Sequence, residues 1–169
     1  MPRIVSTEFR RAAEARESGD VFLEFIRISH DALSDDIRCV NDIVDFMYAG
    51  ELYAGCPFSL SLLTDTDQPP RAKITVQNVD RRIGEAIQAI DDAPNLEILV
   101  MSSADFDLSV KPRTPIGTPT VEYAARFLRL ENVEVDAMTV SADIASWDFT
   151  QEPWPAIRAT KGRLPGLFR

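Results

Sequence analysis

The sequence has few of the side chains that bind metals. Its 169 residues contain one histidine, His30, and two cysteines, Cys39 and Cys56. A structural zinc site takes four ligands and the cysteines form no CxxC pair, so the sequence predicts no metal site. The N-terminal residues MPRIVSTEFRRAAEARESGD lack the apolar segment of a signal peptide. We therefore expect a cytoplasmic chain with reduced thiols rather than a disulfide.

Glycine is also scarce, with seven residues, and this bears on nucleotide binding. In ITVQNVDRRIGEAI, residues 74–87, a strand pattern runs into a helix pattern, and a helix start attracts phosphate. A phosphate loop needs several glycines, whereas Gly84 stands alone four residues after the turn. Asp80 is placed to cap the helix with its own carboxylate, which disfavours a bound anion. We interpret this junction as a structural corner and predict no cofactor.

Basic residues are outnumbered by acidic ones. Eighteen Lys and Arg residues against 27 Asp and Glu residues give a formal net charge of −9. Nucleic-acid binding needs clustered Lys and Arg, so this composition argues against it, and the charge also favours solubility. Long hydrophobic runs are missing as well, since no segment approaches the roughly 20 apolar residues of a membrane-spanning helix. We expect no membrane partner.

The sequence pattern offers no catalytic constellation. His30 is followed by Asp31, but adjacent residues in a polar turn seldom point at the same atom. No serine or cysteine has the context of a nucleophile elbow. The aspartates between positions 31 and 45 lack the spacing of a calcium loop. We therefore predict no catalytic residues and no enzyme, with a hydrolase whose site is unrecognised as the alternative.

The apolar pattern predicts one α+β domain that is mainly antiparallel β. The segments expected to form strands are 21–28, 37–42, 58–62, 72–76, 96–102, 128–131 and 133–136. The apolar positions change parity between Leu130 and Val133, which predicts a β-bulge near Asn132. Because bulges bend sheets, the strands are expected to form a barrel or a sandwich.

Two helices are expected beside the strands. Residues 6–18 have a short amphipathic pattern with Ser6 or Thr7 as the N-cap. The main helix carries Ile83, Ile87 and Ile90 on one face and is expected to pack across the sheet through them. These patterns divide the chain into an N-terminal helical segment (1–20), a β-rich domain (21–146) with helix 80–92, and an extended C-terminal arm (147–169).

The C-terminal arm is rich in aromatic residues and proline. It follows Ser146 as WDFTQEPWPAIRATKGRLPGLFR and has no clear period. Burying a Leu or Phe side chain stabilises by about 1.5–3 kcal/mol, so the arm is expected to be docked. The predicted partner-binding residues are Trp154, Leu167 and Phe168. They either contact a neighbouring subunit or another protein, or they pack on the arm's own domain.

Several segments follow one another in an informative order: VFLEFIRI, RCVND, YAGELYAGCPFSLSL, PPRAKITVQNVDRRIGEAI and LPGLFR. This order resembles a family of unknown function that is encoded in the tail modules of siphophages and prophages. The resemblance covers roughly Val21 to Arg169, and its more specific parts are the Asn-Val-Asp-Arg and Pro-Gly-Leu-Phe elements. The sequence is also similar, more distantly, to the amino-terminal half of lambda-type minor tail proteins L. Those proteins continue into a cysteine-rich iron–sulfur region, and with two scattered cysteines no such cluster is expected here.

The resemblance implies a structural role. Related proteins form rings at the tail tip and join the distal end of the tail tube to the central hub or fibre protein. By this resemblance the chain would form a homo-oligomeric ring, threefold in symmetry, with the distal tail protein and the hub or fibre protein as partners. DNA would pass through an acidic lumen without specific binding. The protein would be made in the bacterial host cytoplasm and end in the virion.

Overall fold

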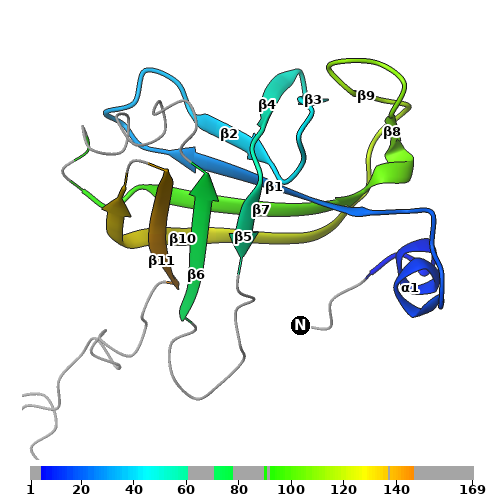
Figure 1. Ribbon diagram of the computed structural model, residues 1–169, viewed down its shortest axis with the longest axis horizontal. Coiled ribbons are helices and arrows are strands. Elements are labelled where there is room, and N and C mark those ends of the chain that lie inside the picture. The colour runs from blue at the N-terminus through cyan, green and yellow to red at the C-terminus, as the bar shows by residue number, and fades with distance from the viewer. Residues whose placement is uncertain (1–4, 61–70, 78–89, 91, 137, 147–169) are drawn as a thin grey trace, which may run out of the picture.

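A nine-stranded sheet and one short helix dominate the part of the chain described by the computed structural model (Figure 1). The described residues are 5–60, 71–77, 90, 92–136 and 138–146. The elements are α1 (Thr7–Glu14), β1 (Phe22–Ser29), β2 (Ile37–Val40), β3 (Phe46–Tyr48), β4 (Glu51–Gly55), β5 (Phe58–Leu60), β6 (Arg71–Gln77), β7 (Asn95–Ser102), a 3-10 turn η1 (Ser103–Asp105), β8 (Phe106–Asp107), β9 (Thr114–Pro115), β10 (Val121–Val135) and β11 (Thr139–Ser146). None of the helices in these ranges is long and apolar enough to cross a membrane.

The strands lie in the order β3-β4-β2-β1-β7-β10-β11-β6-β5, and β8 pairs separately with β9. All neighbours in the large sheet are antiparallel except β2 and β4, which pair in parallel through Cys39–Ala54 and Val40–Gly55. The α+β, mainly antiparallel prediction is therefore confirmed at this level. The sheet is mixed and not closed, so its form is sandwich-like rather than a closed barrel.

The register of the long strand β10 shifts at three places, the first of them against β7 between Val121 and Tyr123. Its register against β11 shifts between Glu131 and Glu134, and Asn132 has a φ of 50°. This confirms the bulge predicted near Asn132. A second shift, against β7, lies between Ala125 and Leu128 and contains Phe127 at a φ of 61°. Because bulges bend a strand, β6 and β11 run across the direction of β1 and β7 (Figure 1).

The larger core joins strands that lie far apart in the sheet order. Ile26 of β1 and Ile74 of β6 belong to one buried cluster, although three strands separate β1 from β6. The sheet therefore curls over on itself, with this cluster between its two parts. Its buried members are Ile26, Ile28, Cys39, Phe58, Ala72, Ile74, Val76, Leu96, Ile98, Leu128, Leu130, Val140, Ala142 and Ile144.

A second core packs on the opposite face of β1 and is largely aromatic. The ring of Phe25 lies 5.7 Å from Phe46, 5.2 Å from Tyr53 and 5.8 Å from Phe106 between centroids. Phe25 faces this cluster and its neighbour Ile26 faces the first, and both are 0% exposed. A strand buried on both faces needs a nearly continuous apolar run, which is why VFLEFIRI reads as a central strand. The structure confirms that position.

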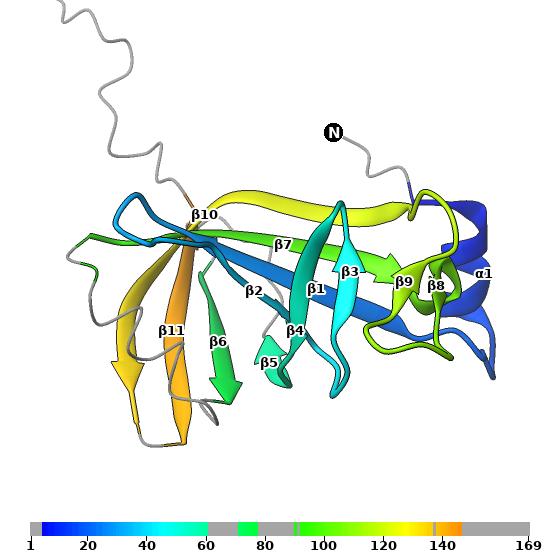
Figure 2. The same ribbon diagram turned by 90° about the horizontal axis from the view of Figure 1, so that it is seen from above.

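The turn before β3 attaches the β8–β9 hairpin to the sheet. Asp42 Oδ2 accepts a hydrogen bond from Arg113 Nη1 at 2.8 Å, and the Arg113 guanidinium lies 5.1 Å from the centre of the Phe46 ring. Gly55 lies so close to this turn that an added Cβ would come 2.7 Å from the backbone N of Val44. Figure 2 shows β3, β4, β8 and β9 gathered beside one another as a result.

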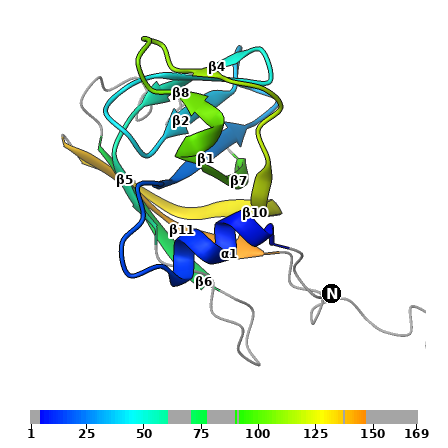
Figure 3. The ribbon, with the colours of Figure 1, turned by 90° about the vertical axis from the view of Figure 1, so that its right-hand side faces the viewer.

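The N-terminal helix begins where the sequence predicts and ends earlier. Ser6 is the N-cap, and its Oγ accepts a hydrogen bond from Phe9 N at 3.0 Å. The helix ends at Glu14 rather than Ser18, because Ala15 is already extended and no helical residue is buried. It is held by the stacked rings of Phe9 and Phe22, whose centroids are 4.1 Å apart. The helix lies at the end of the molecule away from β6 and β11 (Figure 1), and this end faces the viewer in Figure 3. Arm 147–169 and, apart from residues 90 and 92, the predicted main helix lie outside the described residues.

Candidate functional site

The most prominent hollow of the described surface is a cleft of about 780 Å³ over β1 and β7. One wall is the β3–β4 hairpin and the other is the bulge of β10 that holds Phe127. Its lining side chains combine charged, aromatic and small polar groups. They are Arg27, Ser29, Arg38, Tyr48, Ala49, Glu51, Tyr53, Asn95, Leu96, Glu97, Leu99, Arg126 and Phe127.

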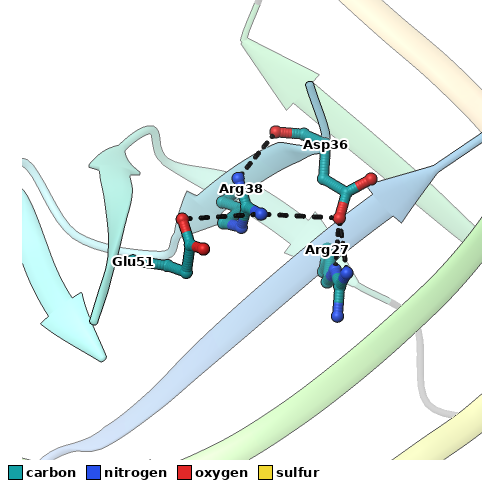
Figure 4. A network of polar contacts seen from close by, with 4 residues as sticks. All are labelled: Arg27, Asp36, Arg38 and Glu51. Atoms are coloured by element: carbon teal, nitrogen blue, oxygen red, sulfur yellow. Dashed lines mark hydrogen bonds and ion pairs between the residues drawn. The ribbon is translucent and has the colours of Figure 1, made fainter. Parts of the chain in front are cut away.

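An ion-pair network supports the cleft beside the β3–β4 hairpin (Figure 4). Both Nε and Nη2 of Arg27 contact Asp36 Oδ2, at 2.7 and 2.5 Å. The Arg38 guanidinium lies 3.5 Å from the same Asp36 oxygen and 3.5 Å from Glu51 Oε2. The hydrogen bond that Arg27 donates to Asp36, together with the negative charge of Asp36, raises the pKa of Arg27, whereas desolvation opposes that rise. The network links β1, the segment before β2, β2 and β4.

Arg126 on the opposite wall is more open. Its Nε donates to Glu97 Oε1 at 2.7 Å, and 63% of its side chain is exposed. Glu97 is its one partner among the described residues, and that contact uses only Nε of the guanidinium. A guanidinium in this position stacks well on an aromatic ring and donates to carboxylates or carbonyls.

The neighbouring Phe127 is the most unusual residue of the cleft. It is 86% exposed and has a positive φ, a conformation that strains a residue with a side chain. Ala49, at the tip of the β3–β4 hairpin, also lines the cleft with a φ of 52°. Two of the three non-glycine residues with positive φ in the described chain thus border one cleft. Such strain concentrates at binding sites, where the surrounding structure holds it in place.

Tyrosines supply the apolar part of the cleft. Tyr48 and Tyr53 lie on the two strands of the hairpin, and Tyr53 is buried against the second core. Desolvation is the largest cause of a raised Tyr53 pKa, and the positive charges of Arg27 and Arg38 counteract part of it. Tyr, Phe and Arg are the residues enriched at protein interfaces and at their energetic hot spots. The cleft is therefore suited to a peptide segment with aromatic and charged side chains.

The structure brings together the two cysteines that sequence analysis treated as scattered. Cys39 is buried in the larger core, and Cys56 packs against that core from the connection between β4 and β5. Their thiols are hydrogen-bonded, and this contact, together with burial, raises the Cys39 pKa well above its ordinary value. Cys56 N also donates to Val40 O at 3.0 Å. The parallel pairing of β2 with β4 creates this proximity, and nothing in the cysteine spacing signals it.

His30 serves the turn in which it lies. Its Nδ1 accepts a hydrogen bond from Ala32 N at 3.0 Å. Within the described ranges, no group of three or more His, Cys, Asp or Glu side chains is arranged to hold a metal ion. The predicted partner-binding residues Trp154, Leu167 and Phe168, and the corner at Asp80, lie outside these ranges. Sequence analysis missed the cleft, because its residues come from strands far apart in the chain.

One protein family matches the chain. Residues 8–159 match a domain of unknown function, DUF1833. No curated protein matches the chain. The match includes all but the first residue of α1, every strand of the described structure and part of the segment that follows Ser146.

Proposed function

The chain belongs to the DUF1833 family, and we propose that it is a structural component of a siphophage tail tip. In this proposal it forms a homo-oligomeric ring, with threefold symmetry, between the distal tail protein and the central hub or fibre protein. DNA passes through the lumen of the ring without specific binding, and the protein resides in the virion. The proposal starts from the resemblance of the sequence to tail-module proteins.

A binding role is supported most directly by the number of large apolar side chains that are exposed to solvent. Ile43 is 84% exposed, Ile116 69%, Phe127 86% and Met138 76%. They lie on turns and on a bulge of an ordered β framework rather than in the core. Each of these side chains can supply an apolar contact of the kind that a ring subunit makes with its neighbours.

The C-terminal segment belongs to the same proposal. In the assembled tail, Trp154, Leu167 and Phe168 contact a neighbouring subunit or the next tail protein. Deleting residues 164–169 tests this part, and we expect a folded subunit that no longer enters particles. If the truncated protein assembles into infectious particles, the segment does not make this contact.

The tail-tip role is tested in the parent phage or prophage. Deleting the gene is expected to give particles whose tails lack a complete tip, and supplying the gene in trans restores them. Electron microscopy of purified particles with a tag on the protein then places it at the distal end. Normal tails without the protein, or absence of the protein from purified virions, would refute the proposal. Hydrolysis of cell-wall material by the purified subunit would favour the alternative enzyme instead.

A further inference from the structure

The described chain ends next to the cleft. Ser146, the last residue of β11, is the register partner of Leu128 in β10. Leu128 directly follows Phe127, which forms the outer wall of the cleft. Residues 147–169 therefore begin one position from the Arg126–Phe127 bulge.

The neighbouring part of β10 has room for an extended segment. β7 pairs with one edge of β10 from Val121 to Arg129. On the other edge, β11 pairs with β10 from Leu128 to Val135. Among the described strands, none therefore pairs with Ala124–Phe127 on that second edge. An open strand edge accepts an extended peptide through backbone hydrogen bonds.

The composition of residues 147–169 complements the rest of the molecule. The segment has four basic and two acidic side chains, a formal charge of +2, whereas the whole chain carries −9. It also contains both tryptophans of the protein, Trp147 and Trp154. The cleft itself is lined by three guanidinium groups and two carboxylates, so charge does not select the segment there. Its fit to the cleft is aromatic, because the Arg126 guanidinium can stack on an indole ring.

We propose that, in the unassembled subunit, residues 147–169 dock onto their own domain along the open edge of β10 and into the cleft beside Phe127. Eight residues separate Ser146 from Trp154 and span up to about 26 Å when extended, enough to reach across the bulge. Direct attachment gives the segment a high effective concentration at the cleft. Docking also covers aromatic residues of the segment that would promote aggregation before assembly.

This inference concerns the free subunit and goes beyond the tail-tip role. In the free subunit the segment covers the cleft. On assembly the same segment would leave the cleft and contact tail proteins. The measurement below uses purified subunits, whereas the tail-tip role is measured on particles. Failure of one is therefore distinguishable from failure of the other.

Trp154 is a specific reporter of docking. In a full-length Trp147→Phe variant it is the one tryptophan, so its emission wavelength and its quenching by acrylamide report on the segment alone. We expect blue-shifted emission and quenching several times weaker than in the urea-unfolded chain. In the same background, Phe127→Gly should expose Trp154 while leaving the far-UV circular dichroism spectrum of the folded domain unchanged, because glycine tolerates the positive φ.

A matched control is Ile43→Gly, which removes an equally exposed apolar side chain from a turn outside the cleft. This variant should retain the protection of Trp154. The proposal is overturned if Trp154 is as accessible as in the unfolded chain, or if Phe127→Gly leaves its protection unchanged. Protection that disappears on dilution would show that a second copy binds the segment, which also overturns docking within one chain.

Discussion

Replacing Phe25 by alanine tests whether the second core contributes to the free energy of unfolding. The alternative is that it is only a layer of loops on the sheet. Phe25 is 0% exposed, and its ring contacts four other aromatic rings that come from β3, β4 and β8. Alanine would remove most of the side chain and leave a cavity among rings fixed by three different elements. Such a site cannot collapse easily, so the cavity should persist.

The expected loss is about 4 kcal/mol in the free energy of unfolding. Core Phe→Ala substitutions cost about 3–5 kcal/mol, and aromatic pairs add roughly 0.5–1.5 kcal/mol each, although these terms overlap. A domain of this kind has a total stability of about 5–15 kcal/mol, so the variant should remain folded but be strongly destabilised.

Urea denaturation followed by circular dichroism measures the effect, and Ile43→Ala is the control. Ile43 is 84% exposed and belongs to neither core, so the change in stability should be within about 0.5 kcal/mol. A loss below about 1 kcal/mol at Phe25 would refute the reasoning, because it would mean that the aromatic cluster contributes little to folding. Equal losses at the two positions would refute the assigned burial of Phe25.

Three further predictions address individual contacts. Asp42→Ala should destabilise the protein by about 1–3 kcal/mol in urea denaturation, because the Arg113 guanidinium, of which a fifth is exposed, loses its charged partner; an unchanged midpoint would contradict this. Iodoacetamide in mildly alkaline buffer should modify Cys56 before Cys39, whose pKa is raised by the neighbouring thiol and by burial; peptide mass spectrometry that finds Cys39 modified first would contradict this order. Burial raises the Tyr53 pKa above its ordinary value of 10.0, so its contribution to stability is full below pH 10 and is lost as pH rises through the folded pKa. Tyr53→Phe should therefore reduce the alkaline loss of stability, and an identical pH profile would rule out this origin.

The strands that can be predicted from the sequence are those whose apolar period is set by one buried face. β6 and β7 agree with their predicted ranges to within one residue at each end. The bulge at Asn132 could also be predicted, because a change in apolar parity has a direct geometric meaning. β11 shows the limit of this approach. Its buried residues alternate as expected of a strand, but the middle one is the small Ala142, so the apolar pattern does not identify the segment as a strand.

Features that depend on pairing between distant segments could not be predicted. The parallel contact of β2 with β4 follows from the path of the chain through the turn at Asp42 and Gly55, not from local preference. The same pairing brings Cys39 close to Cys56. The cleft likewise combines strands from the first, middle and last thirds of the chain, and no motif links them.

At Phe127 the fold requires a particular backbone conformation but does not require an aromatic side chain. A bulge at this position needs a residue with positive φ, and glycine would supply it without strain. For phenylalanine that conformation costs about 1 kcal/mol or more in backbone strain. Because the side chain is 86% exposed, burial within the described domain stabilises it by almost nothing. The fold therefore does not explain the ring, whereas a bound segment that covers it would recover about 1.5–3 kcal/mol of apolar burial. That balance favours Phe127 as an anchor for the C-terminal segment before assembly and as a contact for a tail protein afterwards.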